Sequence, residues 1–250
     1  MIVFNDLQKF ILLPIYYIIH KNYVFGFYHK FFIRKFYYKN LKFELNIKNI
    51  PLENYSSFLF KTYEYNDRVL IIRHISHKNK SIVLGGGIGF IPTLVFKNSM
   101  NKILVFEVNK KIVPNLKKNL IDNKVKFSIY NNNLVYKKTK NKVFYFTKDF
   151  LSTSAFSKTL YEQEVIVKNI EKKKIRNFDK FNTLILDIEG DEEYYIKNIN
   201  KFKNIKYLFF ELHHNIIKEH KIIKLMKILK LNKFILQDKC FNSYYFKKKF

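Results

Sequence analysis

A cluster of glycines followed by a single acid is the stretch whose residue types could perform chemistry. Residues 81–107 read SIVLGGGIGFIPTLVFKNSMNKILVFE, with glycines at 85, 86, 87 and 89 and an acid at Glu107. Glycine allows the backbone to turn tightly and to approach a ligand closely. In a βαβ nucleotide unit, an acid at the tip of the second strand accepts hydrogen bonds from ribose hydroxyls. We therefore predict a nucleoside site here, against the alternative of a plain strand-to-helix turn.

A second concentration of carboxylates lies at residues 187–193, DIEGDEE. The last three acids fall in the first turn of a predicted helix, where negative charge suits the helix dipole. Asp187 and Glu189 have no such explanation. If the preceding strand continues through both, they lie on one side of it, which is costly unless a cation, a proton or a ligand amine is shared. We predict that both line the site.

Further polar residues follow predicted strands or precede the glycine strand. Asn132, within the run at 131–133, lies where an adenine edge could be bound, although asparagine-rich turns are common for other reasons. Glu64, with Asp67, could reach a cofactor amine or could cap a helix. Glu211 and His213 follow an apolar strand, so they should converge with Glu107 and Asp187 at the carboxyl ends of the strands.

Alternating strands and helices are needed to bring these residues together. Apolar strands are predicted at 81–84, 103–106, 125–130, 183–186 and 205–210, with helices at 88–96, 191–200 and 216–231 and a closing antiparallel pair at 234–236 and 243–246. This order predicts an α/β fold with a mostly parallel central sheet and helices on both faces. We expect an N-terminal basic and aromatic extension at 1–60, helical in character, and a main domain at 61–250.

The G-x-G-x-G spacing resembles the loop of S-adenosylmethionine-dependent methyltransferases with a Rossmann-like sheet. LILDIEGDEE resembles the K-x-D-x-E-G-x-E motif of the FkbM family of methyltransferases, and FFELH resembles the acid-x-His step on its next strand. VFEVN is similar to the V-x-x-F-E-P-N motif of that family, and LKKNL to its L-x-x-N-x pattern. The resemblance covers about residues 61–214.

Membership would imply the Rossmann-like class I methyltransferase fold and transfer of a methyl group from S-adenosyl-L-methionine to a hydroxyl of a sugar, glycan, lipid-linked or natural-product acceptor. The cofactor would then contact Gly85, Gly86, Gly87, Gly89, Glu107, Asn132, Asp187 and Glu64. Three positions depart from the pattern. Val83 replaces an acid near the methionine moiety, Ile185 replaces a lysine, and Val108 replaces a proline. These departures leave open a non-catalytic binding module on a degenerate scaffold.

Methyl transfer to a hydroxyl requires a base. His213 is the first candidate because a neutral imidazole accepts a proton near neutral pH, and Glu211 could orient it. Asp187 or Glu189 are alternatives, and a histidine at a strand end is often a structural donor instead. Asp187, Glu189 and His213 also suit a divalent metal in type. Nothing fixes their ligand spacing, so no metal is predicted.

The charge balance bears on partners. A formal net charge of +27 suggests nucleic acid or an anionic membrane surface. AT-rich codons would produce the same bias without a ligand, so nucleic acid is the less favoured partner. An RNA methyltransferase is the rival enzyme, although an N/D-P-P-Y/F motif is absent. Cys240 is the single cysteine, which excludes an internal disulfide and a C-x-x-C site and fits a reducing cytoplasm.

The basic and aromatic segment at 10–43 has two interpretations. Its aromatics could lie at the interface of an anionic membrane with its cations toward the headgroups, giving a cytoplasmic protein with peripheral membrane contact. It could instead be a helical layer packed on the main domain, which we favour. The apolar run at 10–19 is too short for a bilayer span and contains Pro14, and it lacks a signal-peptide cleavage site.

Overall fold

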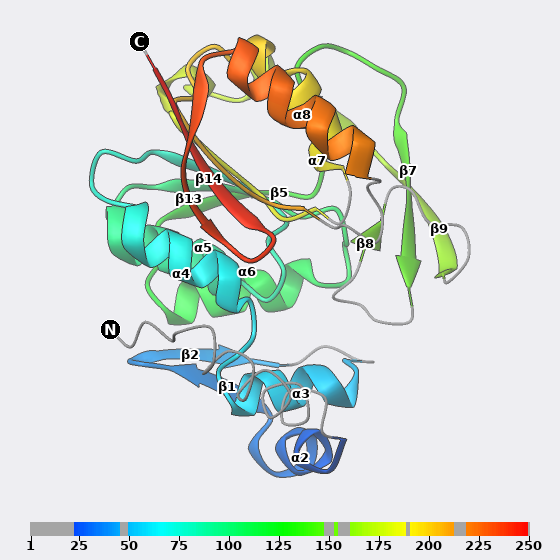
Figure 1. The fold of residues 1–250 in the computed structure, drawn as a ribbon. Helices are drawn as coiled ribbons and strands as arrows, with labels where there is room; N and C mark the ends of the chain where they lie inside the picture. The colour runs from blue at the N-terminus through cyan, green and yellow to red at the C-terminus, as the bar shows by residue number, and fades with distance from the viewer. Residues whose placement is uncertain are drawn as a thin grey trace.

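A seven-stranded sheet forms the centre of the molecule (Figure 1). The computed structural model describes residues 23–45, 50–147, 153–154, 161–188, 191–212 and 219–249. The strand order is β13-β14-β12-β11-β3-β4-β5. Their bounds are β3 Ser81–Leu84, β4 Ile103–Phe106, β5 Phe127–Tyr130, β11 Thr183–Leu186, β12 Tyr207–Glu211, β13 Phe234–Cys240 and β14 Ser243–Lys248.

The pairing directions identify the fold. β12, β11, β3, β4 and β5 run parallel, whereas β14 pairs antiparallel with both β12 and β13. One reversed strand, inserted second from the edge of an otherwise parallel sheet in this order, is the Rossmann-like class I methyltransferase arrangement. The predicted fold is therefore confirmed, including its closing antiparallel pair.

Alternation along the strands explains the two helical layers. Val83, Val105 and Ile185 point to one side, and belong to the core under α4 Tyr65–His74, α5 Phe90–Ser99 and α6 Val113–Asp122. Leu84 and Leu186 point to the other side and share a core with residues of α7 Glu192–Lys197 and α8 Glu219–Leu231. Figure 1 shows these two helices across the sheet from α4 and α5. Side chains with period two thus bury both faces of the sheet, as a parallel sheet requires.

An insertion between β5 and β11 adds smaller strands beside the main sheet. β6 Asn133–Val135 pairs parallel with β10 Asn169–Glu171, and β7 Lys142–Thr147 pairs antiparallel with β8 Thr153–Ser154 and β9 Tyr161–Val167. Short 3-10 helices follow at Lys172–Lys174 and Phe178–Lys180, and a further one, Ile199–Lys201, lies after α7. Residues of this insertion form one wall of the candidate functional site.

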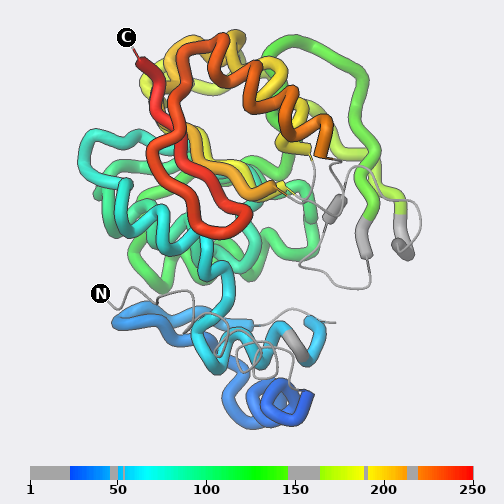
Figure 2. Tube along the Cα trace, in the orientation of Figure 1, coloured from blue at the N-terminus to red at the C-terminus, as the bar shows by residue number. Residues whose placement is uncertain are grey.

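The N-terminal extension lies against one side of the domain (Figure 2). It consists of α2 Tyr23–Tyr28, the π-helical turn η1 His29–Ile33, the hairpin β1 Lys35–Tyr38 and β2 Leu41–Glu44, and α3 Leu52–Leu59. The extension is thus helical in part, because residues 35–44 form strands. Residues 46–49, between the hairpin and α3, lie outside the described chain. Among the described residues, no helix has the length and apolarity to cross a bilayer.

Asparagines of α6 fasten the extension to the domain. Asn119 accepts a hydrogen bond from the Glu44 N–H at 2.8 Å and donates to the Glu44 carbonyl at 3.0 Å. Asn123, one turn further on, forms the same pair of bonds with the backbone of Lys42. Residues four apart lie on one helix face, so two amide side chains pair with the outer edge of β2 as a neighbouring strand would.

Phe36 tests whether the extension is part of the core. Its ring is fully buried against Phe43, Phe58 and Phe90, with centroid distances of 5.6, 5.4 and 5.0 Å. We expect Phe36→Ala to lower the free energy of unfolding by about 3–5 kcal/mol. Phe32→Ala, at a ring that is 72% exposed, should change it by about 0.5 kcal/mol or less. Denaturant unfolding measures both, and similar small losses in the two variants would contradict the shared core.

Candidate functional site

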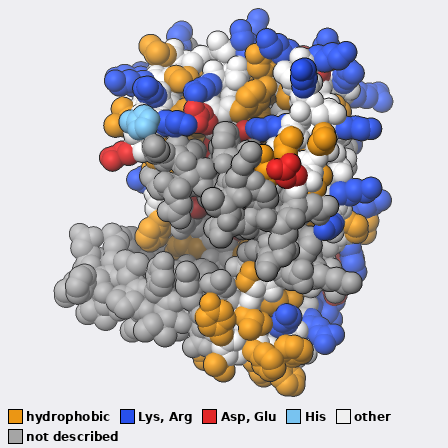
Figure 3. Space-filling model, turned by 90° about the vertical axis from the view of Figure 1, so that its right-hand side faces the viewer, with side chains coloured by type: hydrophobic (Ala, Val, Ile, Leu, Met, Phe, Trp, Pro, Cys, Tyr) orange, Lys and Arg blue, Asp and Glu red, His pale blue; other side chains and the backbone are white. Residues whose placement is uncertain are grey.

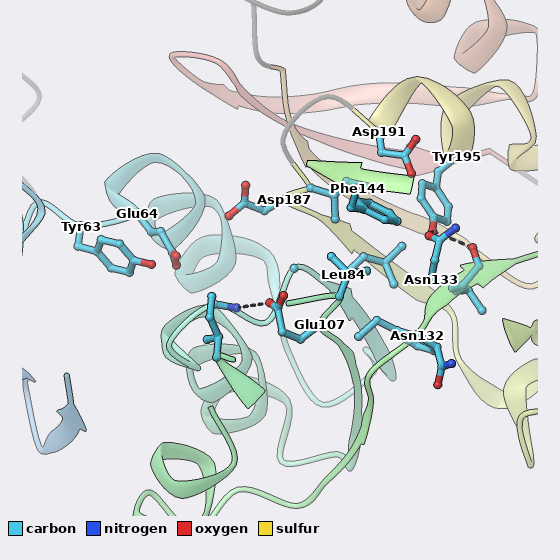
Figure 4. A pocket seen from close by; sticks show the side chains of 17 residues that line it. Tyr63, Glu64, Leu84, Glu107, Asn132, Asn133, Phe144, Asp187, Asp191 and Tyr195 are labelled. Carbon is cyan, nitrogen blue, oxygen red and sulfur yellow. Dashed lines mark hydrogen bonds between the residues drawn. The ribbon is translucent and has the colours of Figure 1, made fainter. Parts of the chain in front are cut away.

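Glu107 joins the tip of β4 to the glycine turn after β3. Its Oε2 accepts hydrogen bonds from the N–H groups of Gly86 and Gly87, both at 3.0 Å (Figure 4). Its Oε1 accepts the N–H of Asn109 at 2.8 Å. Burial raises the pKa of Glu107, and these three backbone donors oppose that rise. The Glu107 carboxylate lines the pocket, and the N–H groups of the glycine turn hold it in position.

A pocket opens at the carboxyl ends of the parallel strands, beside this turn (Figure 4). It holds about 710 Å³ of space outside the protein atoms, counted to its open mouth. It is lined by Tyr63, Glu64, Leu84, Gly85, Gly87, Phe106, Glu107, Val108, Ile112, Asn132, Asn133, Leu134, Phe144, Asp187, Ile188, Asp191 and Tyr195.

Six of the residues predicted to bind a cofactor line this pocket: Glu64, Gly85, Gly87, Glu107, Asn132 and Asp187. Gly86 and Gly89 lie behind its wall. A Cβ on Gly86 would lie 2.6 Å from a methyl group of Leu116, and Gly89 begins α5 with a φ of +91°. Their role in the turn is to allow close packing and a left-handed conformation.

The position of Gly85 leaves no room for a side chain. Its φ is +87°, and a Cβ there would lie 1.8 Å from the carbonyl oxygen of Asp187. The turn after β3 and the end of β11 therefore approach each other more closely than a side chain permits. This contact brings Asp187 to the glycine turn.

Carboxylates gather at this end of the pocket. Glu64 and Asp187 line it, and single oxygens of Asp67, Asp187 and Glu211 lie within 4.8 Å of one another. Glu211, at the end of β12, also accepts a hydrogen bond from Asn242 at 2.6 Å. Such a cluster in a basic protein can accept hydrogen bonds from an ammonium group, and its oxygens are also of the type that binds a hard divalent cation.

Glu64 faces the pocket rather than capping a helix. It precedes α4 in the left-handed region, with φ 47°, and makes no side-chain capping bond. The capping alternative is therefore wrong for this residue. Its Oε2 is buried and has no hydrogen-bond partner among the residues that the structure describes. Burial, and next the charge of Asp187, raise the pKa of Glu64 well above its usual range. A cation that entered the pocket would offset both the cost of burying the ionised Glu64 and its repulsion by Asp187.

The opposite end of the pocket is less acidic and contains rings. Asn132 lies there with Asn133, Phe144 and Tyr195 (Figure 4). The Asn132 amide donates to the carbonyl of Lys168 at 3.2 Å, which leaves its amide oxygen as an acceptor. The Tyr195 hydroxyl donates to the Leu134 carbonyl at 2.8 Å. This end can hold a flat ring through apolar contact and a few polar groups.

Sequence reasoning missed the pair formed by Asp191 and Lys142. Asp191 was assigned to the helix dipole, but it is buried, lines the pocket and is ion-paired with Lys142 of β7. Burial raises the pKa of Asp191, and Lys142 opposes the rise. The five acids in seven residues signalled an unusual site here. Lys142 lies in the insertion, where no periodic pattern connects it with that segment. Tyr63, Phe144 and Tyr195 were also missed, because no local pattern in the sequence shows that these side chains meet at the pocket.

The acidic segment begins directly after β11. β11 ends at Leu186, so the condition for placing Asp187 and Glu189 on one side, that the strand continues through both, is not met. The carboxyl group that interacts electrostatically with Asp187 is that of Glu64, whose pKa is raised by the charge of Asp187. Glu189 and His213 lie outside the described residues, so their predicted catalytic roles remain predictions.

Comparison with known proteins gives distant structural similarities. No family model and no curated protein sequence matches the chain. An uncharacterized protein from Listeria monocytogenes serotype 4b aligns with 73% of this chain at 9% identity and a TM-score of 0.46. The alignment covers 66% of that protein, just under two thirds of its length.

Two further structures have similar scores. TYW2 from Pyrococcus horikoshii, in complex with MeSAdo, aligns with 85% of this chain and 68% of its own at 10% identity, with a TM-score of 0.47. A putative RNA methyltransferase from the same organism aligns with 79% of this chain and 83% of its own at 12% identity, with a TM-score of 0.42. These values are low, so the fold assignment rests on the strand order.

The raised pKa of Glu64 predicts a pH-dependent effect of Glu64→Gln. The folded protein holds this proton more tightly than the unfolded chain, so the stabilisation is present below the unfolded pKa of about 4.3 and is lost as pH rises through the folded pKa. The amide cannot ionise. Glu64→Gln should therefore match the unsubstituted protein near pH 4 and exceed its free energy of unfolding by about 1–3 kcal/mol above the folded pKa.

Glu164→Gln is the matched control, because Glu164 is exposed on β9. It should follow the unsubstituted protein at every pH. Denaturant unfolding at a series of pH values measures all three proteins. A Glu64→Gln variant that is less stable at high pH would contradict the inference that ionising the buried Glu64 carboxyl destabilises the fold.

Proposed function

We propose that this protein is an S-adenosyl-L-methionine-dependent methyltransferase. The observation that carries the proposal is the distribution of carboxylates around one glycine turn. Glu107 lies on the side of β4, while Glu64 and Asp187 lie on the side of β11, and all three face the same pocket. A ligand with hydroxyls at its centre and a cationic tail matches this distribution.

The residues present fit that cofactor. Glu107 would accept a hydrogen bond from a ribose hydroxyl through the lone pair left free by the three backbone donors. Asn132 and the apolar side chains of Val108 and Leu134 would hold the adenine. Glu64 and Asp187 would hold the ammonium group, in place of the acid that is missing at Val83. The unpartnered Glu64 oxygen and its raised pKa support this assignment, because an incoming cation would favour the ionised form.

When bound, the sulfonium group supplies an activated methyl. The chain would align the acceptor oxygen with it and remove a proton. We propose His213 as the base, with Asp187 or Glu189 as alternatives. Glu211 supports this region, because it ends β12 two residues before His213 and is held by Asn242.

For the acceptor, we propose a hydroxyl of a sugar, glycan or lipid-linked molecule. This follows from the resemblance of four segments to FkbM motifs, and FkbM membership is itself part of the proposal. An RNA acceptor is the alternative favoured by the net charge of +27. A non-catalytic binding module is the alternative favoured by Val83. Contact with an anionic membrane is a separate proposal, argued below.

Cofactor binding tests the proposal directly. Titration calorimetry at pH 8 should show binding of S-adenosyl-L-methionine, and Glu64→Gln should weaken it about tenfold because a charged hydrogen bond is lost. The same substitution is expected to stabilise the free protein, so its effects on binding and on stability have opposite signs. Glu164→Gln should bind normally. If the unsubstituted protein does not bind at millimolar cofactor, the non-catalytic module is favoured.

Radiolabelled cofactor distinguishes the acceptors. The protein is incubated with methyl-labelled S-adenosyl-L-methionine and a cell extract, and the products are divided between nuclease and glycosidase digestion. We expect label to appear in material that resists nuclease, because the proposed acceptor is a sugar or lipid-linked hydroxyl. Label released by nuclease would assign the protein to RNA instead. An Asp187→Asn variant should transfer less label, while Glu164→Gln should match the unsubstituted protein.

A further inference from the structure

The N-terminal extension presents one strongly aromatic surface to solvent. Over α2 and η1, the exposed side chains include Val24 at 74%, Phe32 at 72% and Tyr23 at 62%. Phe27, Tyr28 and Phe31 are about half exposed. Figure 3 shows hydrophobic side chains gathered at this end of the molecule, next to Lys and Arg. We call these six residues the aromatic face. An exposed apolar patch of this kind marks an interaction site.

The aromatic face is a feature of a folded element. The opposite side of the same helical segment is buried, because Gly26 packs on the backbone of Leu52 and His29 packs on the rings of Tyr55 and Phe58. The exposed rings are themselves ordered in rows four residues apart. Phe27 packs on Phe31 in a tilted arrangement with ring centroids 4.4 Å apart, and Tyr28 stacks on Phe32 at 5.3 Å. The segment is therefore amphipathic with its aromatic side outward.

The sequence segment that contains the aromatic face carries formal charge of one sign. Between Asp6 and Glu44 the sequence contains no acidic residue. The described part of this interval carries the cations Lys30, Arg34, Lys35, Lys39 and Lys42. A second copy of the chain would bring like charges together across a shared aromatic face. An anionic partner is therefore required.

We propose that the aromatic face docks on the surface of an anionic lipid bilayer. Aromatic rings with polar edges are favoured at the level of the headgroups, and flanking cations gain from the negative surface potential. Val24 has no ring on which a base could stack. The exposed rings form convex rows packed on one another, rather than a cationic groove that follows a nucleic acid backbone. These features favour a lipid surface over RNA.

The aromatic face is linked to the pocket. Tyr63 lines the pocket, and its ring packs on Phe58 at 4.5 Å and on Phe36 at 6.2 Å. Phe58 in turn packs on His29, on the buried side of the helical segment. Docking through the aromatic face would hold the pocket close to the bilayer. Under the proposed function, this placement suits a lipid-linked acceptor, but the docking itself does not depend on that function.

Vesicle sedimentation with the full chain tests the docking. The protein should sediment with phosphatidylcholine vesicles that contain phosphatidylserine and much less with phosphatidylcholine alone. Raising the salt concentration should weaken the binding. The double variant Val24→Ser/Phe32→Ser should bind anionic vesicles about tenfold more weakly, because two exposed apolar contacts are removed. Leu231→Ser, at an exposed side chain of α8, is the matched control and should bind normally.

Three results would overturn the proposal. These are no binding to anionic vesicles, equal binding by the double variant, and a dimer of the unsubstituted protein that the double variant loses. Binding of an RNA oligonucleotide that depends on the aromatic face, without vesicle binding, would also overturn it. Unchanged thermal unfolding of the double variant shows that the fold is retained. Cofactor affinity, measured separately, should not change, so failure of docking and failure of the proposed function are distinguishable.

Discussion

The hydrogen bonds from the N–H groups of Gly86 and Gly87 to Glu107 are the constraint on which the site depends. They join the ends of two adjacent parallel strands, so the glycine turn and the acid keep a fixed separation. The turn can approach β11 because Gly85 has no side chain where the Asp187 carbonyl lies. Behind the turn, Asn119 donates to the Ile88 carbonyl at 2.8 Å while it also binds β2. One small set of backbone contacts thus positions the pocket and connects it with the extension.

Charge within the pocket opposes the charge of the whole protein. The chain is strongly basic, yet Glu64, Asp187, Asp67 and Glu211 converge beside the glycine turn. Burial and mutual repulsion raise the pKa of Glu64, which means that its ionised form is costly until a cation arrives. At the other end, Asp191 is balanced by Lys142. The two ends of the pocket therefore differ, since one is compensated internally and the other has a buried oxygen without a described partner. Under the proposed function, that difference would orient a ligand with a cationic tail.

The extension combines two surfaces of opposite character. Phe36 and Phe43 of its hairpin are fully buried in the core that underlies α5, and the asparagines of α6 pair with the edge of β2. The aromatic face, only a few residues earlier, is exposed. The aromatic and cationic composition of residues 10–43 is uniform, so composition alone could not separate the packed part from the exposed part. The hairpin decides it, because alternate side chains of a strand point to opposite sides.

The sequence by itself determined the strands and helices of the main domain and their layered order, since buried strands and amphipathic helices have distinct apolar patterns. It also indicated Glu107, Asn132 and Asp187 as pocket residues, because residues at the carboxyl ends of parallel strands meet at one edge. Tertiary structure alone decided that β11 ends before Asp187, that Glu64 faces the pocket, and that Lys142 meets Asp191. These depend on contacts between segments far apart in the chain, and a local pattern of residue types carries no information about which distant side chain lies opposite.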